Sequence, residues 1–260
     1  MTKRWVRFDD GGTPAFGVVE GDKVRVYAGD MFADAWATER EVDAEGLALL
    51  PPSEPTKVIA LWNNFRALGA KLGVSAPVDP LYLLKAVSSV TSPGATVNRP
   101  KAYDGRLVYE GELGIVIGKR LCNAGVEEAE AGIFGYTCVN DITAGDLLNK
   151  DPNFAQWARA KSFDGFCPFG PVIATGIDPA GLTIRTLVNG AERQNSPVSD
   201  MIFPAADLVS RISADMTLMP GDLIACGTSV GVGAMKEPEN VVEVLIEGIG
   251  TLRNIVRTTA

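Results

Sequence analysis

The chain has 260 residues, of which 46% are hydrophobic and 22% charged, a composition typical of a soluble globular protein with one substantial core. Its net charge of −8 and its lack of a lysine and arginine cluster argue against nucleic-acid binding. No apolar run approaches the ~20 residues of a membrane span, and the first residues do not resemble a signal peptide. We therefore expect a cytoplasmic protein that binds neither nucleic acid nor a membrane.

The sequence contains no histidine. This excludes Ser-His-Asp and Cys-His catalysis, histidine-ligated zinc, and any imidazole acid or base near neutral pH. The four cysteines are far apart and form no CxxC motif, so we expect buried free thiols rather than a zinc cluster or a disulfide framework. Any chemistry must therefore use carboxylates, lysine, tyrosine, water or a hard metal ion.

The first 50 residues alternate between short strand-like segments and turn signals. This pattern predicts a small β-meander with strands at 5–8, 15–19 and 23–27. The proline-rich segment 51–55 breaks regular structure and is the best domain boundary. We therefore expect an N-terminal domain over residues 1–53 and a second domain over residues 54–260.

The second domain is predicted to be rich in strands, with only a few short helices. Helical spacing occurs at 64–72, at 128–131 and in the second half of 147–160. Strands are predicted at 57–61, 133–139, 172–174, 182–188, 222–226, 241–246 and 252–256. Because this pattern is not a repeating βαβ unit, it indicates an α+β fold that is mostly β.

Two glutamates separated by one glycine, Glu110 and Glu112, interrupt an apolar run. Residues two apart in a strand point to the same face, so both carboxylates should lie beside buried core. There they need a proton, a basic partner or a cation. Asp141 follows a predicted strand and offers a third carboxylate, and such a set suits Mg²⁺ or Mn²⁺. From spacing alone, a solvated acidic edge strand with Asp141 as a cap is an equal alternative.

Other segments offer groups that bind anions. Lys161 precedes an aromatic, Pro/Gly-stiffened segment, and its ammonium could stabilise a developing enolate; a surface lysine is the alternative. The glycine-rich segment 227–233, which includes Gly227 and Thr228, could bind a carboxylate through backbone amides and hydroxyls, or could be a plain turn. One further cation and two hydroxyls come from Lys85, Ser88 and Ser89.

Taken in order, five motifs of the chain resemble those of the fumarylacetoacetate hydrolase superfamily. The motifs are Lys85-x-x-Ser88-Ser89, Tyr109-Glu110-Gly111-Glu112-Leu113, Asn140-Asp141-Ile142-Thr143-Ala144, Lys161-Ser162-Phe163-Asp164 and the segment 227–233. The similarity covers roughly residues 55–257, and the early meander matches a small N-terminal domain of many members. The resemblance implies a catalytic domain with a mixed β-roll or sandwich fold and, usually, a homodimer.

The resemblance also implies a site and a class of substrate. Mg²⁺ or Mn²⁺ would be held by Glu110, Glu112 and Asp141, Lys161 would assist, and Thr228 would contact the substrate. Family substrates are 2-oxo acids or β-diketo acids, often from aromatic degradation. The reactions include C–C bond hydrolysis, decarboxylation and keto–enol isomerisation, all of which benefit from a metal that polarises a carbonyl.

Three positions depart from the family pattern, two of them where hydrolytic members carry catalytic residues. Those members commonly carry a histidine four residues after an asparagine, and a glutamate three residues further on, which deprotonate the attacking water. Counted from Asn64, these positions hold Leu68 and Lys71. The arginine that often follows the Thr-Ala pair is replaced by Gly145, and Arg66 is a candidate for supplying that cation from another direction.

The leading hypothesis is therefore a metal-dependent enzyme that enolises a small 2-oxo or dicarboxylic acid. The catalytic candidates are Lys161, Lys71 and Arg66, together with metal-bound water. General-base help is typically worth about 10²–10⁴-fold, so loss of the histidine should impair hydrolysis most. C–C bond hydrolysis by metal-bound water is the alternative. A homologue that binds metal and ligand with little turnover is the second alternative.

Overall fold

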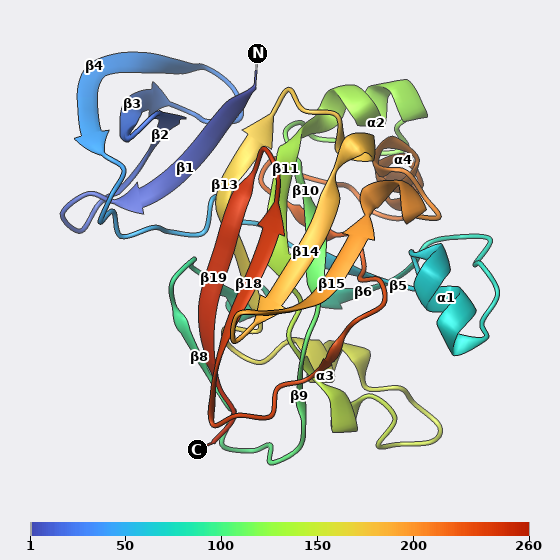
Figure 1. Ribbon diagram of the computed structural model, residues 1–260. Helices are drawn as coiled ribbons and strands as arrows, with labels where there is room; N and C mark the ends of the chain where they lie inside the picture. The colour runs from blue at the N-terminus through green and yellow to red at the C-terminus, as the bar shows by residue number, and fades with distance from the viewer. Residues whose placement is uncertain (1, 260) are drawn as a thin grey trace.

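The computed structural model describes residues 2–259, which form three β-sheets and four short α-helices (Figure 1). The mostly β architecture predicted from the sequence is confirmed. The helices and the 3₁₀ turns connect strands or cover sheet ends. They are α1 (Arg66–Leu72), α2 (Val126–Gly132), α3 (Trp157–Lys161), α4 (Ala205–Asp215), η1 (Val87–Ser89), η2 (Gly145–Leu147), η3 (Pro179–Gly181) and η4 (Val198–Asp200).

The central sheet has eleven strands among the described residues. Ten of them follow the order β4-β3-β2-β1-β13-β11-β10-β16-β5-β6, and β7 pairs with β13. Their bounds are β1 (Lys3–Asp9), β2 (Pro14–Glu20), β3 (Lys23–Gly29), β4 (Ala35–Asp43), β5 (Val58–Trp62), β6 (Leu81–Lys85), β7 (Val90–Thr91), β10 (Gly111–Ile117), β11 (Ile133–Asn140), β13 (Cys167–Thr175) and β16 (Leu223–Ala225).

The other two sheets are smaller. The five-stranded sheet has the order β15-β14-β18-β19-β8, with β8 (Thr96–Asn98), β14 (Thr183–Val188), β15 (Ala191–Pro197), β18 (Glu239–Ile246) and β19 (Gly250–Arg257). The three-stranded sheet has the order β12-β9-β17, with β9 (Leu107–Tyr109), β12 (Thr143–Ala144) and β17 (Gly233–Ala234).

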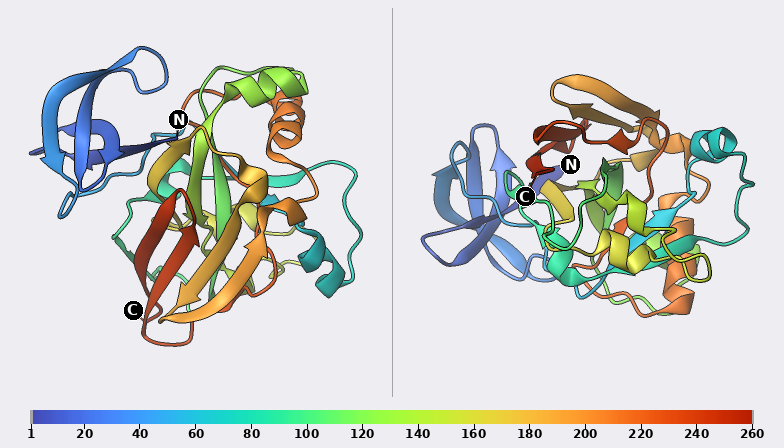
Figure 2. Two further views of the ribbon diagram at one scale, coloured as in Figure 1. Left: turned by 45° about the horizontal axis from the view of Figure 1, so that its top comes forward. Right: turned by 90° about the horizontal axis from the view of Figure 1, so that it is seen from below.

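The main core lies between the central sheet and the five-stranded sheet, which packs against β10, β11 and β13 (Figures 1 and 2). Alternation of side chains explains this packing. Leu113 and Ile115 of β10 belong to the same buried cluster as Val244 and Ile246 of β18. Val116 of β10 points to the opposite face and packs in a separate cluster. The β10 strand is therefore buried on both faces, as its continuous apolar sequence predicts.

The N-terminal strands form the predicted meander and continue the central sheet. β1 pairs with β13 in antiparallel register, with Arg4 opposite Ala174. In both views of Figure 2 the β2–β4 strands extend to one side of the remaining strands. The pairing of β1 with β13 joins the residues before and after position 53 into one sheet. The predicted domain boundary near residue 53 therefore stays a prediction.

All four cysteines are free, as predicted, but only three of them are buried. Cys122 is exposed, because it lies in the loop after β10 rather than on a core strand. None of the helices within residues 2–259 is long and apolar enough to cross a membrane.

Candidate metal centre

The candidate site lies where two neighbouring strands leave the central sheet together. The pairing of β10 with β11 ends at Gly111 and Asn140. Beyond these residues the two backbone segments belong to the three-stranded sheet, as β9 and β12. Glu110 and Asp141 occupy the step between the sheets. The backbone N–H of Asp141 donates to the carbonyl oxygen of Glu110 at 2.8 Å. The step therefore fixes these two residues opposite each other.

Three carboxylates converge at this junction. One oxygen atom from each of Glu110, Glu112 and Asp141 lies within 4.8 Å of the others. Glu112 and Asp141 are fully buried, and the Glu110 side chain is 16% exposed. The sequence predicts this convergence, but its placement of both glutamates on one strand is wrong. Glu110 lies in the break between β9 and β10, because the chain changes sheets there.

Two buried ammonium groups face the carboxylates. Lys161, at the end of α3, donates from Nζ to Glu110 Oε2 at 2.9 Å and also to Asp141 Oδ2. Lys85, at the end of β6, donates to Asp141 Oδ1 and to the carbonyl oxygen of Phe166. Asp141 is therefore held between two lysines, whereas Glu112 forms no ion pair with any described residue.

Burial and neighbouring charges shift the pKa values of Glu112 and Asp141 in opposite directions. Burial, and then the charge of Asp141, raise the pKa of Glu112 well above its ordinary value. Burial also acts to raise the pKa of Asp141, but the charges and hydrogen bonds of Lys161 and Lys85 outweigh it and lower that pKa. The pKa of Lys161 is raised despite its burial, because Asp141 and Glu110 stabilise the ammonium form. Lys161 is thus a charged hydrogen-bond donor in the metal-free protein.

The donor set fits a hard divalent cation. The three residues offer only oxygen ligands, which Mg²⁺ and Mn²⁺ prefer. Glu112 Oε2 accepts a hydrogen bond from the backbone N–H of Gly227 at 2.8 Å, but its Oε1 is buried with no hydrogen-bond partner among the described residues. An unpaired buried carboxylate oxygen is costly unless a proton or cation meets it. Glu110, Glu112 and Asp141 are therefore the residues that would hold the ion.

Two neighbouring residues orient the glutamates, and neither was predicted. The Thr143 hydroxyl donates to Glu110 Oε1 at 2.8 Å. Gln194, on β15 of the five-stranded sheet, accepts from the Gly111 backbone N–H at 2.9 Å and donates to the Thr228 hydroxyl at 2.7 Å. That hydroxyl donates to the Gly111 carbonyl oxygen at 3.1 Å. The three hydrogen bonds form a closed ring around the residue that separates the two glutamates.

Gly111 has to be glycine because two strands of the five-stranded sheet approach its backbone. A Cβ atom at this position would lie 1.9 Å from Thr186 Oγ1 and 3.1 Å from Gln194 Oε1. Any larger residue would push β14 and β15 away and open the ring of hydrogen bonds. The glycine between the glutamates is therefore a packing requirement of the site.

The remaining predicted residues divide into two groups. Gly227 and Thr228 contact the Glu110–Glu112 segment, as described above. Ser88 is exposed, and the buried Ser89 hydroxyl donates to the Ala86 carbonyl oxygen. These serines are tied to η1 rather than to the carboxylates, because η1 turns the chain away after Lys85.

The two cationic candidates on α1 also lie apart from the carboxylates. Arg66 donates to the backbone carbonyl oxygens of Asp200 and Met201, and Lys71 is exposed in the last helical turn. Neither residue therefore forms a contact that supports its predicted catalytic role.

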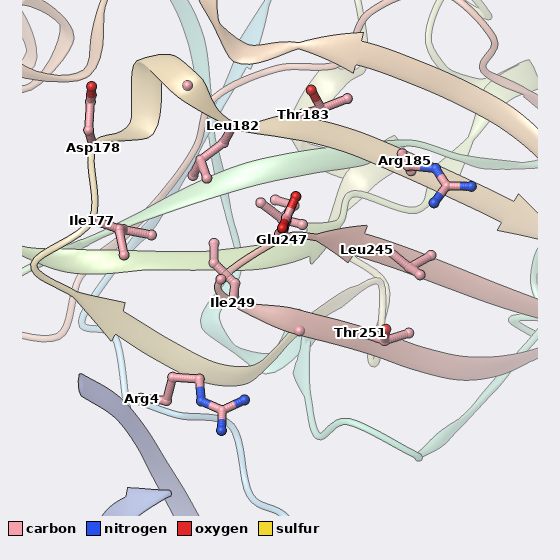
Figure 3. Close-up of a pocket in the computed structure, with 14 residues that line it drawn as sticks. Arg4, Ile177, Asp178, Leu182, Thr183, Arg185, Leu245, Glu247, Ile249 and Thr251 are labelled. Carbon is pink, nitrogen blue, oxygen red and sulfur yellow. The ribbon is translucent and has the colours of Figure 1, made fainter. Parts of the chain in front are cut away.

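A separate pocket of about 780 Å³ is formed by the loop after β13, the turn between β18 and β19, and Arg4 of β1 (Figure 3). The side chains of Arg4 and Arg185 lie at its edges. None of the three carboxylate residues lines it, and neither does any residue of β6 or α3, the elements that carry Lys85 and Lys161.

Comparisons with known proteins bear on the function. Residues 57–257 match the family model described as fumarylacetoacetate (FAA) hydrolase C-terminal, and residues 3–52 match Rv2993c-like, N-terminal. The oxaloacetate tautomerase YisK of Bacillus subtilis is 35% identical, with 91% of this chain and 84% of the relative covered. The 2,4-didehydro-3-deoxy-L-rhamnonate hydrolase of a Sphingomonas species is 32% identical, with 97% and 95% covered.

Solved structures are similar over almost the whole chain. The crystal structure of 2-hydroxyhepta-2,4-diene-1,7-dioate isomerase from Mycobacterium marinum has a TM-score of 0.89 and 37% identity, and the similarity covers 98% of each chain. The fold is therefore shared from the N-terminal meander to β19.

We predict that Glu112→Gln stabilises the metal-free protein. Because the pKa of Glu112 is raised on folding, the unfolded chain loses this proton first as the pH rises above about 4.5. The free energy of unfolding should then fall by about 1.4 kcal/mol per pH unit until the folded-state pKa is reached. Glutamine removes this penalty, so urea unfolding should show an advantage for the variant that grows with pH. Added Mn²⁺ should stabilise only the wild type. Equal stabilisation of both proteins by Mn²⁺ would contradict the assignment.

Thr143→Val should weaken Mn²⁺ binding about 10–100-fold, because Glu110 loses the hydroxyl that orients it. Thr143→Ser keeps the hydroxyl and is the matched control, expected to bind Mn²⁺ within about twofold of the wild type. Calorimetric titration measures both. Unchanged binding by the valine variant would show that Thr143 does not position Glu110.

Proposed function

The chain belongs to the fumarylacetoacetate hydrolase superfamily, and from this we propose that it is a Mg²⁺- or Mn²⁺-dependent enzyme that acts on a small 2-oxo or β-diketo acid through an enolate. The proposed reaction is tautomerisation or isomerisation, or decarboxylation. One observation carries the proposal: three carboxylates and a protonated lysine converge in a chain that has no histidine.

The divalent ion, when bound, would polarise the substrate carbonyl and stabilise negative charge on its oxygen. The chain's own residues have separate roles. Glu110, Glu112 and Asp141 provide the anionic site, and Lys85 holds Asp141 in place. Lys161 uses two of its three N–H groups on Glu110 and Asp141, which leaves one to donate to a developing enolate oxygen.

Several parts of the proposal rest on the family alone. Contacts of Lys85, Ser88, Ser89, Gly227 and Thr228 with the substrate stay predictions. So do proton transfer by Lys71 and the replacement of the missing arginine by Arg66. A homodimer, a cytoplasmic location and a role in aromatic-compound catabolism are also proposals. Proton transfer by Lys161 or by metal-bound water also stays a prediction: the carboxylates that raise the pKa of Lys161 in the metal-free protein are the ones that would hold the ion.

Hydrolysis of a C–C bond is the second candidate. It is favoured by the 32% identity to the rhamnonate-derivative hydrolase. The sequence argues against it, because no histidine can activate water and Leu68 is a buried apolar residue at the position where hydrolytic members carry that histidine. A homologue that binds metal and ligand without turnover is the third candidate, motivated by the same missing histidine.

An oxaloacetate assay separates these candidates. With Mn²⁺, we expect the wild type to accelerate enol–keto conversion, followed by ultraviolet absorbance, and to exchange the C3 hydrogens with D₂O. Release of CO₂ and pyruvate would assign decarboxylation as the reaction. Lys161→Met should lower kcat about 10²–10³-fold because the enolate loses its cationic donor, while Mn²⁺ binding persists. The exposed Lys119→Met is the control and should retain wild-type kcat.

Two results would contradict the proposal. Cleavage of an acylpyruvate faster than tautomerisation would favour the hydrolase. Tight binding of oxalate with no turnover of either substrate would favour the binding protein.

A further inference from the structure

We propose that an apolar pocket lined in part by β6 and α3, the two elements that carry Lys85 and Lys161, binds the tail of the substrate, so that the preferred substrates are 2-oxo acids that end in an aliphatic or aromatic group. This inference rests on the proposed function and narrows its substrate class. The pocket has a volume of about 760 Å³, and its lining is almost entirely apolar or aromatic: Trp62, Leu72, Leu81, Tyr82, Leu83, Leu148, Asn149 and Trp157.

Strand β6 connects this pocket to the carboxylates. Leu81, Leu83 and Lys85 alternate along the strand and therefore share one face. Their exposure falls in that order: Leu81 is 42% exposed, Leu83 is half-buried, and Lys85 is buried against Asp141. One face of the strand thus leads from the pocket mouth to an ammonium group of the site.

Helix α3 also connects the pocket to the carboxylates. Trp157 and Lys161 are four residues apart, so they lie on one face of the helix, about 6 Å apart along its axis. Trp157 is half-buried in the pocket wall, with its ring centroid 5.8 Å from that of Trp62, and Lys161 is buried against Glu110 and Asp141. The two tryptophans form an aromatic wall one helical turn from the catalytic ammonium.

The segment after β12 is the third part of the chain that connects the carboxylates with the pocket. Thr143, which holds Glu110, begins β12, and the chain then passes through η2 to Leu148 in the pocket lining. The Leu148 carbonyl oxygen accepts from the Gln156 backbone N–H at 2.8 Å, which ties this segment to the start of α3. Three separate segments therefore run from the carboxylate cluster to the same pocket.

The apolar lining of the pocket favours one kind of substrate tail over another. None of the described residues that line the pocket is charged, so the terminal carboxylate of a dicarboxylic acid would lose water without gaining a partner. An aliphatic or aromatic end would instead cover apolar side chains that are now exposed, including Leu72 and Leu81. An apolar end is favoured for this reason.

Tryptophan fluorescence with Mn²⁺ present tests the inference, with pyruvate, 2-oxohexanoate, 2-oxooctanoate and 2-oxohexanedioate as probes. We expect affinity to rise about two- to fourfold for each added methylene group. The monoacid 2-oxohexanoate should bind at least about tenfold more tightly than 2-oxohexanedioate, which carries a second carboxylate. Affinity that does not depend on tail length, or tighter binding of the diacid, would overturn the inference.

Two matched variants on β6 test whether the substrate tail binds in this pocket. Leu81→Asn should remove most of the chain-length dependence, because Leu81 lines the pocket and is exposed, so the fold tolerates the change. Leu84→Asn is the control: Leu84 is 47% exposed, points to the other face of β6 and does not line the pocket, so the dependence should persist. Equal effects of the two variants would overturn the inference.

Oxaloacetate has no tail, so its turnover reports on the proposed function independently of the pocket. Turnover of oxaloacetate without chain-length dependence would refute the pocket alone. Chain-length-dependent binding without any turnover would support the pocket and refute the proposed enzyme.

Discussion

A buried charge imbalance at one junction of the fold determines the rest of the site. Three carboxylates share this junction with two ammonium groups, and both lysines are bonded to Asp141. Burying charged groups is costly unless each is paired. The pairing leaves Glu112 without a cation, and burial together with the Asp141 charge raises its pKa. The same imbalance that costs stability in the metal-free protein would favour binding of a divalent ion.

The scaffold can hold this imbalance because all three sheets meet at the site. Glu112 lies on the central sheet, and Glu110 and Asp141 lie at the step to the three-stranded sheet. Gln194 reaches in from the five-stranded sheet and closes the ring of hydrogen bonds around Gly111. Hydrogen bonds between these sheets and buried core packing on β10 oppose any movement of the carboxylates away from one another.

The sequence predicts the charged part of the site because that chemistry is concentrated in short motifs around Glu110, Asp141 and Lys161. It does not reveal Gln194 as a positioning residue, because a single buried polar side chain on a distant segment has no periodic pattern. Thr143 lies inside the Asn140–Ala144 motif, but its contact with Glu110 depends on the pairing of β12 with β9, which the sequence does not show. Every strand and helix that we predict overlaps an observed element. The elements that were missed include β4, β6, the polar edge strand β15 and helix α4: β15 lacks strand-like alternation, whereas the spacing of buried residues on α4 was recognisable.

The central claim is that the three carboxylates form a divalent-cation site. The most direct measurement is an anomalous difference map from a crystal of the protein soaked in Mn²⁺. The account predicts one strong peak in contact with carboxylate oxygens of Glu110, Glu112 and Asp141. A map without a peak there, in a crystal where Mn²⁺ is bound elsewhere and Lys161 still bridges Glu110 and Asp141, would contradict it.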